Sequence, residues 1–202
     1  MIKNIVFDLG SVIVKGTPRD ILNKTDLSEG EKDILLQIFL NQKNFDELDG
    51  GFVTLEEIFN QNINKIPAYL LDKAKDIFCK YYEYRDYDED VIDLLKLLKN
   101  NRYNIYILSN NNNEVIEYLM NKEWAKVIDG WLSSSECHIT KPNLEIYNLF
   151  YKKFALDQKE CLFIDDKEKN IIAGKETGMD GIVFINYENL KLELLNRGIK
   201  ID

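Results

Sequence analysis

The stretch NIVFDLGSVIV (Asn4–Val14) places a single acid, Asp8, near the end of an apolar run and a glycine, Gly10, two positions later. A short, nearly continuous apolar run is typical of a strand buried on both faces of a parallel sheet. Open α/β sheets bind ligands outside the carboxyl ends of their strands. The stretch therefore predicts a first buried strand that carries Asp8 into a functional site.

Similar apolar runs recur after residue 88 and alternate with helical patterns. In the clearest helical pattern, apolar residues at i, i+3, i+4 and i+7 share one face between Val91 and Leu98. Strands that alternate with helices predict an α/β core with a parallel sheet, formed by residues 1–16 and 89–202. The other expected strands are Ile105–Leu108, Ile128–Leu132, Cys161–Ile164 and Ile182–Ile185, and the other expected helices are Val115–Met120, Leu144–Phe154, Ile171–Thr177 and Leu190–Leu195.

Residues 17–88 interrupt this alternation, because they contain no strand-like runs but several helix starts. Two capping boxes, Ser28 with Glu31 and Thr54 with Glu57, mark the beginnings of helices. The segment follows the first strand directly, so it is expected to lie over the ligand end of the sheet. We therefore expect an all-helical cap over residues 17–88, placed as a lid.

The composition excludes several classes of protein. The 202 residues carry a net charge of −9, whereas a general nucleic-acid binder needs a basic face. No apolar run approaches the ~20 residues of a membrane span, and an acid at position 8 leaves no room for a signal-peptide core. Three scattered cysteines are typical of reduced thiols. We expect a cytoplasmic protein without nucleic-acid or membrane partners, a monomer or weak homodimer.

Polar residues follow the apolar runs at several strand ends. Ser109 and Asn110 follow Leu108, and the pair Asp165–Asp166 follows Ile164. Because the strands are expected to be parallel, these groups and Asp8 should share one edge of the sheet. Carboxylates that meet there repel one another unless a cation joins them, and Mg²⁺ prefers oxygen ligands. The pattern predicts a magnesium site.

Four motifs occur in a fixed order along the chain: VFDLGSV (Val6–Val12), ILSN (Ile107–Asn110), TKPNLEIY (Thr140–Tyr147) and FIDDKEKNIIAGKETGM (Phe163–Met179). Together they resemble the motifs of the haloacid dehalogenase-like hydrolases. The resemblance spans nearly the whole chain and implies a Rossmann-like sheet with a small helical cap after its first strand. The FDLGxVxV form looks closest to sugar-phosphate phosphatases of the glucose-1-phosphatase sort, related to the amino-terminal phosphatase half of soluble epoxide hydrolase.

The resemblance implies a Mg²⁺-dependent phosphatase of a small phosphorylated metabolite such as a sugar phosphate. Asp8 would attack phosphorus and form an aspartyl phosphate that water then hydrolyses. Ser109 and the backbone amide of Asn110 would hold phosphate oxygens. Lys141 would offset the charge on Asp8 and on the phosphoryl group, because one anion must attack another.

The same resemblance implies a set of oxygen ligands for the metal. One Asp8 oxygen, the backbone carbonyl of Gly10 and Asp166 would hold Mg²⁺. Asp165 would bind through water or orient the other ligands. Asn170 would orient the loop of the fourth motif.

The sequence departs from the family pattern at Gly10, where most phosphatases of this family carry a second aspartate. That aspartate protonates the leaving group and then activates water, a contribution typically worth about 10²–10⁴-fold. Its absence leaves three outcomes: a slow enzyme, a preference for leaving groups that depart without much protonation, or a substitute from the cap or from water. The sequence names no substitute.

Alternative interpretations remain for single residues and for the whole chain. His138 reads as a loop residue rather than a general base, Cys137 as a small loop residue rather than a reactive thiol, and Arg19 as a surface arginine rather than a substrate contact. Tyr81, Tyr82, Tyr84 and Tyr87 read as packing residues rather than a sugar-stacking wall. A 2-haloacid dehalogenase, which needs no metal, and a non-catalytic binding protein are the competing functions.

Overall fold

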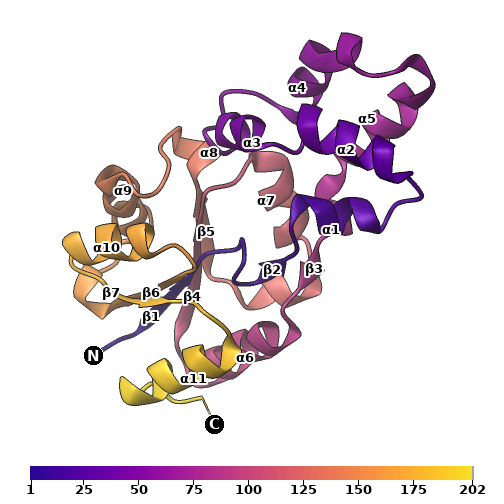
Figure 1. Cartoon of the computed structure of the whole chain (residues 1–202). Coiled ribbons are helices and arrows are strands. Elements are labelled where there is room, and N and C mark those ends of the chain that lie inside the picture. The colour runs from indigo at the N-terminus through magenta and orange to yellow at the C-terminus, as the bar shows by residue number, and fades with distance from the viewer. Residues whose placement is uncertain (202) are drawn as a thin grey trace.

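A five-stranded parallel sheet forms the centre of the protein in this computed structural model, which describes residues 1–201 (Figure 1). The central strand pairs in register with both neighbours, so that Ile5 lies opposite Ile105 on one side and Leu162 on the other. The expected α/β fold with a parallel sheet is confirmed. The strand order is β5 (Gly130–Ser133), β4 (Asn104–Ser109), β1 (Asn4–Phe7), β6 (Cys161–Asp165) and β7 (Asp180–Val183).

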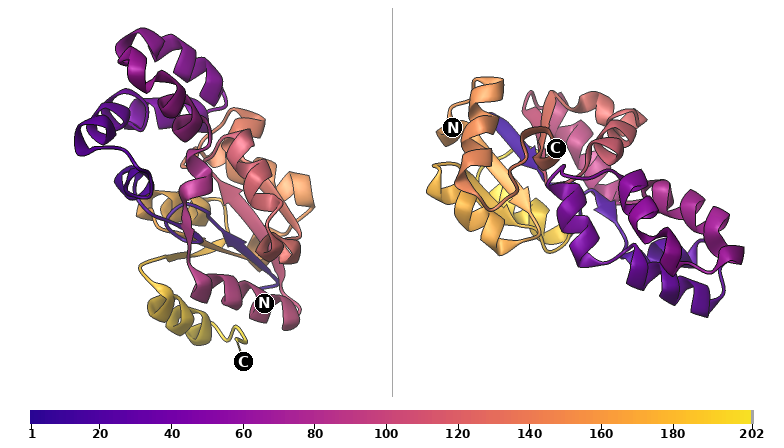
Figure 2. Two further views of the ribbon diagram at one scale, coloured as in Figure 1. Left: turned by 90° about the vertical axis from the view of Figure 1, so that its right-hand side faces the viewer. Right: turned by 90° about the horizontal axis from the view of Figure 1, so that it is seen from above.

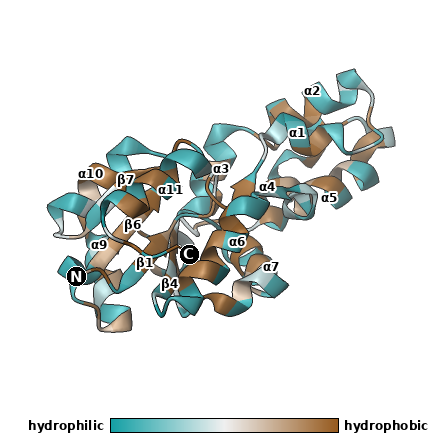
Figure 3. Cartoon of the chain, turned by 90° about the horizontal axis from the view of Figure 1, so that it is seen from below, coloured by the Kyte–Doolittle hydropathy of each residue, from teal (hydrophilic) through white to brown (hydrophobic). Residues whose placement is uncertain are grey.

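Alternate residues of each strand point to opposite faces of the sheet, and each face is covered by its own helices. Ile5 and Phe7 belong to one apolar cluster, whereas Val6 belongs to the other. Figure 3 shows the strands as mostly hydrophobic and the helices as a mixture of hydrophobic and hydrophilic residues. The covering helices are α6 (Glu89–Asn100), α7 (Asn113–Met120) and α11 (Tyr187–Asn196) on the first face, and α9 (Leu144–Phe154) and α10 (Glu168–Glu176) on the second.

Five α-helices and three short 3-10 helices lie between β1 and α6, in the segment that we call the cap region (residues 17–84). Both predicted capping boxes form, since Glu31 accepts from the Ser28 backbone at 2.7 Å and Glu57 accepts from the Thr54 backbone at 2.8 Å. In the left view of Figure 2 these helices lie at the end of the sheet opposite the N-terminus, which is the end that β1 points toward. The α-helices are α1 (Pro18–Asn23), α2 (Glu29–Ile38), α3 (Gln42–Asp49), α4 (Leu55–Asn62) and α5 (Leu71–Cys79).

The two links between the cap region and the core pair with each other, which the sequence did not indicate. Strand β2 (Val14–Lys15) runs antiparallel to β3 (Asp86–Tyr87). The ion pair between Lys15 and Asp88, at 2.7 Å, joins the links beside this ribbon. Two-residue strands are too short to show a period, so residues 86–87 were included in the expected all-helical segment.

The last strand begins and ends two residues earlier than the expected Ile182–Ile185. Pairing with β6 explains the shift, because Asp165 lies opposite Val183 at the end of the ladder. Ile185 lies beyond the sheet and is 70% exposed. Gly181 begins the apolar part of β7, where a Cβ would come within 2.9 Å of Ile171 on α10. Within residues 1–201, no helix has the length and apolar character needed to cross a membrane.

Candidate active site

Asp8 lies directly beyond β1, at the carboxyl edge of the sheet. Its backbone N–H donates to the Ile164 carbonyl at 2.8 Å, and its Oδ1 accepts from the Leu9 N–H at 2.7 Å. Burial raises the pKa of Asp8 to about 6, with Lys141 and the Ser109 hydroxyl lowering it and Asp165 raising it. The carboxylate is therefore destabilised by its surroundings unless a cation accompanies it.

Lys141 brings a cation into this edge of the sheet. Its buried Nζ lies 3.1 Å from Asp8 Oδ1 and 2.7 Å from Asp165 Oδ2, and it donates to the Leu108 carbonyl at 2.8 Å. Burial alone would lower the pKa of Lys141, but the two carboxylates outweigh it, so that its pKa is raised. All three hydrogens of the ammonium thus have acceptors, and Lys141 is held charged against the acid of the first strand.

Both carboxylate oxygens of Asp165 already accept two hydrogen bonds each. Its Oδ1 accepts from the Lys167 backbone N–H at 2.8 Å and from Asn170 Nδ2 at 2.9 Å. Its Oδ2 accepts from Lys141 and, at 3.0 Å, from Asn170. Asp165 is fully buried, so its geometry suits orienting Lys141 and the following loop rather than direct contact with a ligand.

Asp166 presents the opposite situation, because one of its oxygens has no partner. Within residues 1–201, Asp166 Oδ1 is buried and makes no hydrogen bond. Burial and the neighbouring Asp165 raise its pKa. Asp8, Asp165 and Asp166 offer oxygens that all lie within 4.8 Å of one another. An oxygen-only donor set with an unpartnered buried carboxylate oxygen fits a hard divalent cation such as Mg²⁺.

The end of β4 adds hydroxyl and amide groups to the same site. Ser109 is buried, and its hydroxyl lowers the pKa of Asp8. The Asn110 side chain is committed to the backbone of Lys141: its Nδ2 donates to the Lys141 carbonyl at 3.0 Å, and its Oδ1 accepts from the Lys141 N–H at 2.8 Å. The side chain of Asn110 therefore holds Lys141 in position. The backbone amide of Asn110 takes no part in these two hydrogen bonds.

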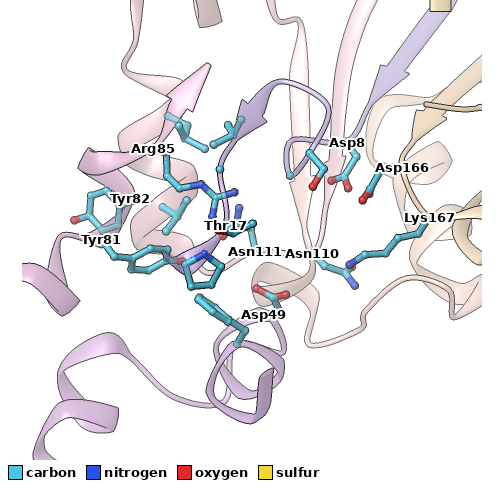
Figure 4. Close-up of a pocket in the computed structure, with 18 of the residues that line it drawn as sticks. Asp8, Thr17, Asp49, Tyr81, Tyr82, Arg85, Asn110, Asn111, Asp166 and Lys167 are labelled. Carbon is cyan, nitrogen blue, oxygen red and sulfur yellow. The ribbon is translucent and has the colours of Figure 1, made fainter. Parts of the chain in front are cut away.

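A cavity of about 360 Å³ opens from these groups toward the cap region (Figure 4). Gly10 lines it beside Asp8, and a Cβ added at Gly10 would meet no atom within 4 Å. Figure 4 shows Asp8 and Asp166 on the sheet side, with Asp49 and Arg85 approaching from the side of the cap region. The charged side chains that line the cavity are Asp8, Asp49, Arg85, Lys141, Asp166 and Lys167.

The model of the haloacid dehalogenase-like hydrolases matches residues 2–178 of this chain. The chain belongs to this family. The resemblance predicted from the four motifs is therefore confirmed at the level of the family and of hydrolase activity, while the sugar-phosphatase subgroup of the first motif stays a prediction.

Curated relatives of this hydrolase include phosphatases with different substrates. A D-ribitol-5-phosphate phosphatase of Bacteroides thetaiotaomicron is 29% identical over 190 residues, covering 89% of this chain and 90% of the relative. The sesquiterpene phosphatase astK of Aspergillus oryzae is 25% identical over 185 residues, covering 89% of this chain and 88% of the relative.

Solved structures of the same fold include both phosphate-bound enzymes and dehalogenases. A HAD family enzyme of Bacteroides thetaiotaomicron, in complex with magnesium and inorganic phosphate, superposes with a TM-score of 0.71 at 21% identity, covering 94% of this chain and 99% of that one. An L-2-haloacid dehalogenase of Xanthobacter autotrophicus gives a TM-score of 0.65 at 16% identity, covering 99% of this chain and 85% of that one. These structures share the fold of this hydrolase.

The predicted site residues of the hydrolase converge, whereas most of the residues with alternative interpretations lie outside the cavity lining. His138 Nδ1 contacts the Gly50 carbonyl at 3.0 Å, and its ring stacks on Phe52 outside the cavity lining. Arg19 forms ion pairs with Glu29 and Asp33 in the cap region. Of the four tyrosines, Tyr81 and Tyr82 line the cavity, and Tyr84 and Tyr87 do not. Cys137 hydrogen-bonds to backbone carbonyls.

Three cavity residues of this hydrolase carried no signal in the sequence. Asp49 precedes two glycines, Arg85 follows a run of tyrosines, and Lys167 is an ordinary lysine after the paired acids. No spacing marks Asp49 and Arg85, because their places depend on how the cap region sits over the sheet, whereas Lys167 lies in the core, two residues after β6.

Proposed function

We propose that this hydrolase is a Mg²⁺-dependent phosphatase of a small phosphorylated metabolite, and that Asp8 forms an aspartyl phosphate. The carrying observation is the buried Lys141 ammonium, which lies within 3.1 Å of Asp8 and 2.7 Å of Asp165 beside the unpartnered Asp166 oxygen. A nucleophilic carboxylate, a fixed cation and an oxygen donor set at one cavity suit phosphoryl transfer. The magnesium and phosphate bound by a structure of the same fold, and the phosphatase relatives, support this reading.

The metal ligands in this proposal are an Asp8 oxygen, the Gly10 carbonyl and Asp166. Asp165 orients these ligands and does not bind the metal directly, because its oxygens already accept from Lys141, Asn170 and the Lys167 backbone. When bound, Mg²⁺ neutralises phosphate charge and polarises the P–O bonds.

The remaining residues hold the phosphoryl group and the nucleophile. Asp8 attacks phosphorus with the oxygen that does not bind metal, and Lys141 offsets the negative charge of both partners. The Ser109 hydroxyl and the Asn110 backbone amide bind phosphate oxygens from the end of β4. Lys141 keeps its position because Asn110 and Leu108 hold it from two sides.

The far end of the cavity favours a polar organic group. Arg85 lines it, and its Nε is buried without a hydrogen-bond partner. Among residues 1–201, no carboxylate forms an ion pair with Arg85, although the chain carries 35 acids. A buried guanidinium nitrogen without a partner is costly unless a ligand supplies an acceptor. Hydroxyl-rich or acidic metabolites, such as a sugar or sugar-alcohol phosphate, supply them, whereas a terpenyl phosphate does not.

A panel of phosphate esters assayed with purified protein and Mg²⁺ tests this function, run beside Asp8→Asn. We expect turnover of small polar phosphomonoesters, loss of turnover in Asp8→Asn and inhibition by EDTA. Silence across aryl, anomeric and acyl phosphates, together with thermal stabilisation by a ligand, would instead indicate a binding protein. Halide release from a 2-chloro acid in the presence of EDTA would indicate a dehalogenase.

A further inference from the structure

The cavity contains one carboxylate that the proposed reaction does not yet use. Of the acids that line it, Asp8 is the nucleophile and Asp166 a metal ligand, which leaves Asp49. Gly10 offers no side chain for proton transfer, and its surroundings are open. An unassigned acid therefore faces a site that lacks its proton donor.

The contact between the cap region and the core fixes the position of Asp49. Asp49 is the last residue of α3, and its carbonyl accepts a hydrogen bond from the Ser134 hydroxyl of the helix α8 (Ser134–Cys137). Gly51 has a φ of +69°, and a Cβ there would come within 2.6 Å of the Ser135 carbonyl. Only glycine allows both this backbone conformation and this close approach. The backbone that carries Asp49 is thus tied directly to the core.

The side chain of Asp49, by contrast, is free to act. Within residues 1–201, no hydrogen bond or ion pair holds its carboxylate, although the residue is partly buried. Figure 4 shows the carboxylate turned into the cavity below Asn111 and Asn110, on the opposite side from Asp8 and Asp166. A partly buried acid without a partner is unfavourable for stability alone.

We propose that Asp49 is the general acid and general base of this hydrolase, supplied by the cap region in place of the side chain missing at Gly10. This assignment rests on the proposed phosphatase function. It makes closure of the cap region over the sheet a requirement for proton transfer as well as for substrate binding.

The direction of the reaction explains why an acid on the cap side is suitable. In phosphoryl transfer the attacking and leaving oxygens lie roughly in line with phosphorus. Asp8 attacks from the sheet side, so the leaving oxygen points toward the cap region, where Asp49 lies. Asp49 therefore lies on the side of the leaving oxygen, whereas the proposed metal ligands Asp8 and Asp166 lie on the sheet side.

The two half-reactions balance with Asp49 as the only proton carrier. In the first, Asp8 forms a bond to phosphorus, the bond from phosphorus to the leaving oxygen breaks, and that oxygen takes the proton of Asp49. In the second, a water oxygen bonds to phosphorus, the bond to Asp8 breaks, and Asp49 takes a proton from the water. Asp8 and protonated Asp49 are regenerated, and phosphate is released.

The electrostatic surroundings give Asp49 a suitable protonation state. Burial raises its pKa to about 7; Lys167 and Lys141 lower it, and Asp8 and Asp46 raise it. A proton donor near neutral pH must hold its proton in a sizeable fraction of molecules, which an ordinary aspartate does not. The phenol of Tyr81 also lines the cavity, but burial raises its pKa further above neutrality.

Substrates with different leaving groups separate proton transfer from binding. Asp49→Asn keeps the size of the side chain, and we expect it to lower kcat on an alkyl phosphate by about 10²–10⁴-fold with little change in KM. In the wild type, kcat/KM should decline above neutral pH as Asp49 loses its proton. In Asp49→Asn this decline should be absent. For p-nitrophenyl phosphate, whose leaving group needs no proton, the first turnover should keep its rate and only the later turnovers should slow.

Two further variants complete the experiment. Glu47→Gln removes a carboxylate from the same helix, where Glu47 pairs with Lys43 at 3.8 Å outside the cavity lining, and it should leave these parameters unchanged. Gly10→Asp in the Asp49→Asn background should restore at least part of the lost alkyl phosphate activity.

The outcomes separate this inference from the proposed function. If Asp49→Asn hydrolyses an alkyl phosphate at the full rate while Asp8→Asn is inactive, the inference is wrong and the proposed function is still supported. An equal loss on both substrates with raised KM would also overturn it, because that pattern indicates a binding role. A wild-type protein that hydrolyses no phosphate ester would overturn both.

Discussion

The Lys141 ammonium lies 3.1 Å from the Asp8 carboxylate, in a setting where both groups are almost fully buried. The two residues come from distant parts of the chain, and Asp165 and Asn110 hold the lysine in place. A buried ion pair of this kind contributes little net stability, but removal of one partner leaves an uncompensated charge.

Lys141→Met should therefore cost about 3–5 kcal/mol of unfolding free energy, because Asp8 and Asp165 lose their shared cation. Denaturant unfolding without metal measures the effect. Lys153→Ala is the matched control, since Lys153 pairs at the surface with Glu136 at 2.7 Å, where such pairs contribute about 0–1 kcal/mol. Equal effects of the two variants would contradict the structural role of Lys141.

Asp166 should control magnesium binding. A ligand that binds only the folded state, at about 100 times its Kd, stabilises by about 2.7 kcal/mol, so Mg²⁺ should raise the Tm of the wild type on the order of 5–10 °C. Asp166→Asn removes a ligand and should abolish this rise. The exposed Asp72→Asn removes an equal charge and should retain it. An undiminished rise in Asp166→Asn would place the ion elsewhere.

Arg85→Gln should weaken the use of polar substrates. Hydrogen bonds to a charged group contribute about 1.5–3 kcal/mol, so kcat/KM for a sugar-alcohol phosphate should fall roughly 10- to 100-fold. An aryl phosphate without hydroxyl groups should be affected less. Arg19→Gln is the control, because its two terminal guanidinium nitrogens already pair with Glu29 and Asp33. Uniform losses on all substrates would argue against a specificity role.

Asp49 should make stability depend on pH. Burial raises its pKa from 3.8 to about 7 in the folded protein, so the folded state binds this proton more tightly than the unfolded state. Asp49 therefore lowers the free energy of unfolding above pH 7, and this loss becomes smaller as the pH falls toward 4. Asp49→Asn should be more stable than the wild type at pH 8, by at most about 4 kcal/mol, and the difference should narrow at pH 5. A difference that does not vary with pH would show that Asp49 titrates normally.

Local patterns predicted the parts of the fold and site that depend on short segments. The apolar run before Asp8, the paired acids after Ile164 and the capping box at Thr54 all form as expected, because strand burial and helix capping are decided by neighbouring residues. The parallel sheet then brings the strand ends to one edge. Asp8, Ser109 and the paired acids could thus be placed together from the sequence.

Long-range docking decided the parts that the sequence did not indicate. Asp49 reaches the cavity because Gly51 packs on Ser135 across two segments far apart in the chain. Arg85 reaches it because the short β2–β3 ribbon sets where the cap region re-enters the core. Neither contact leaves a periodic pattern, so no spacing rule could have found these residues.

The chemical nature of the intermediate tests the central claim most directly. Wild-type protein is mixed with substrate and Mg²⁺, quenched in acid within a turnover, digested and measured by mass spectrometry. We predict one phosphoryl group on the peptide that contains Asp8, removable by hydroxylamine as expected for an acyl phosphate, and absent from Asp8→Asn. A turning-over enzyme whose phosphoryl group sits on another residue, or on none, would contradict the account.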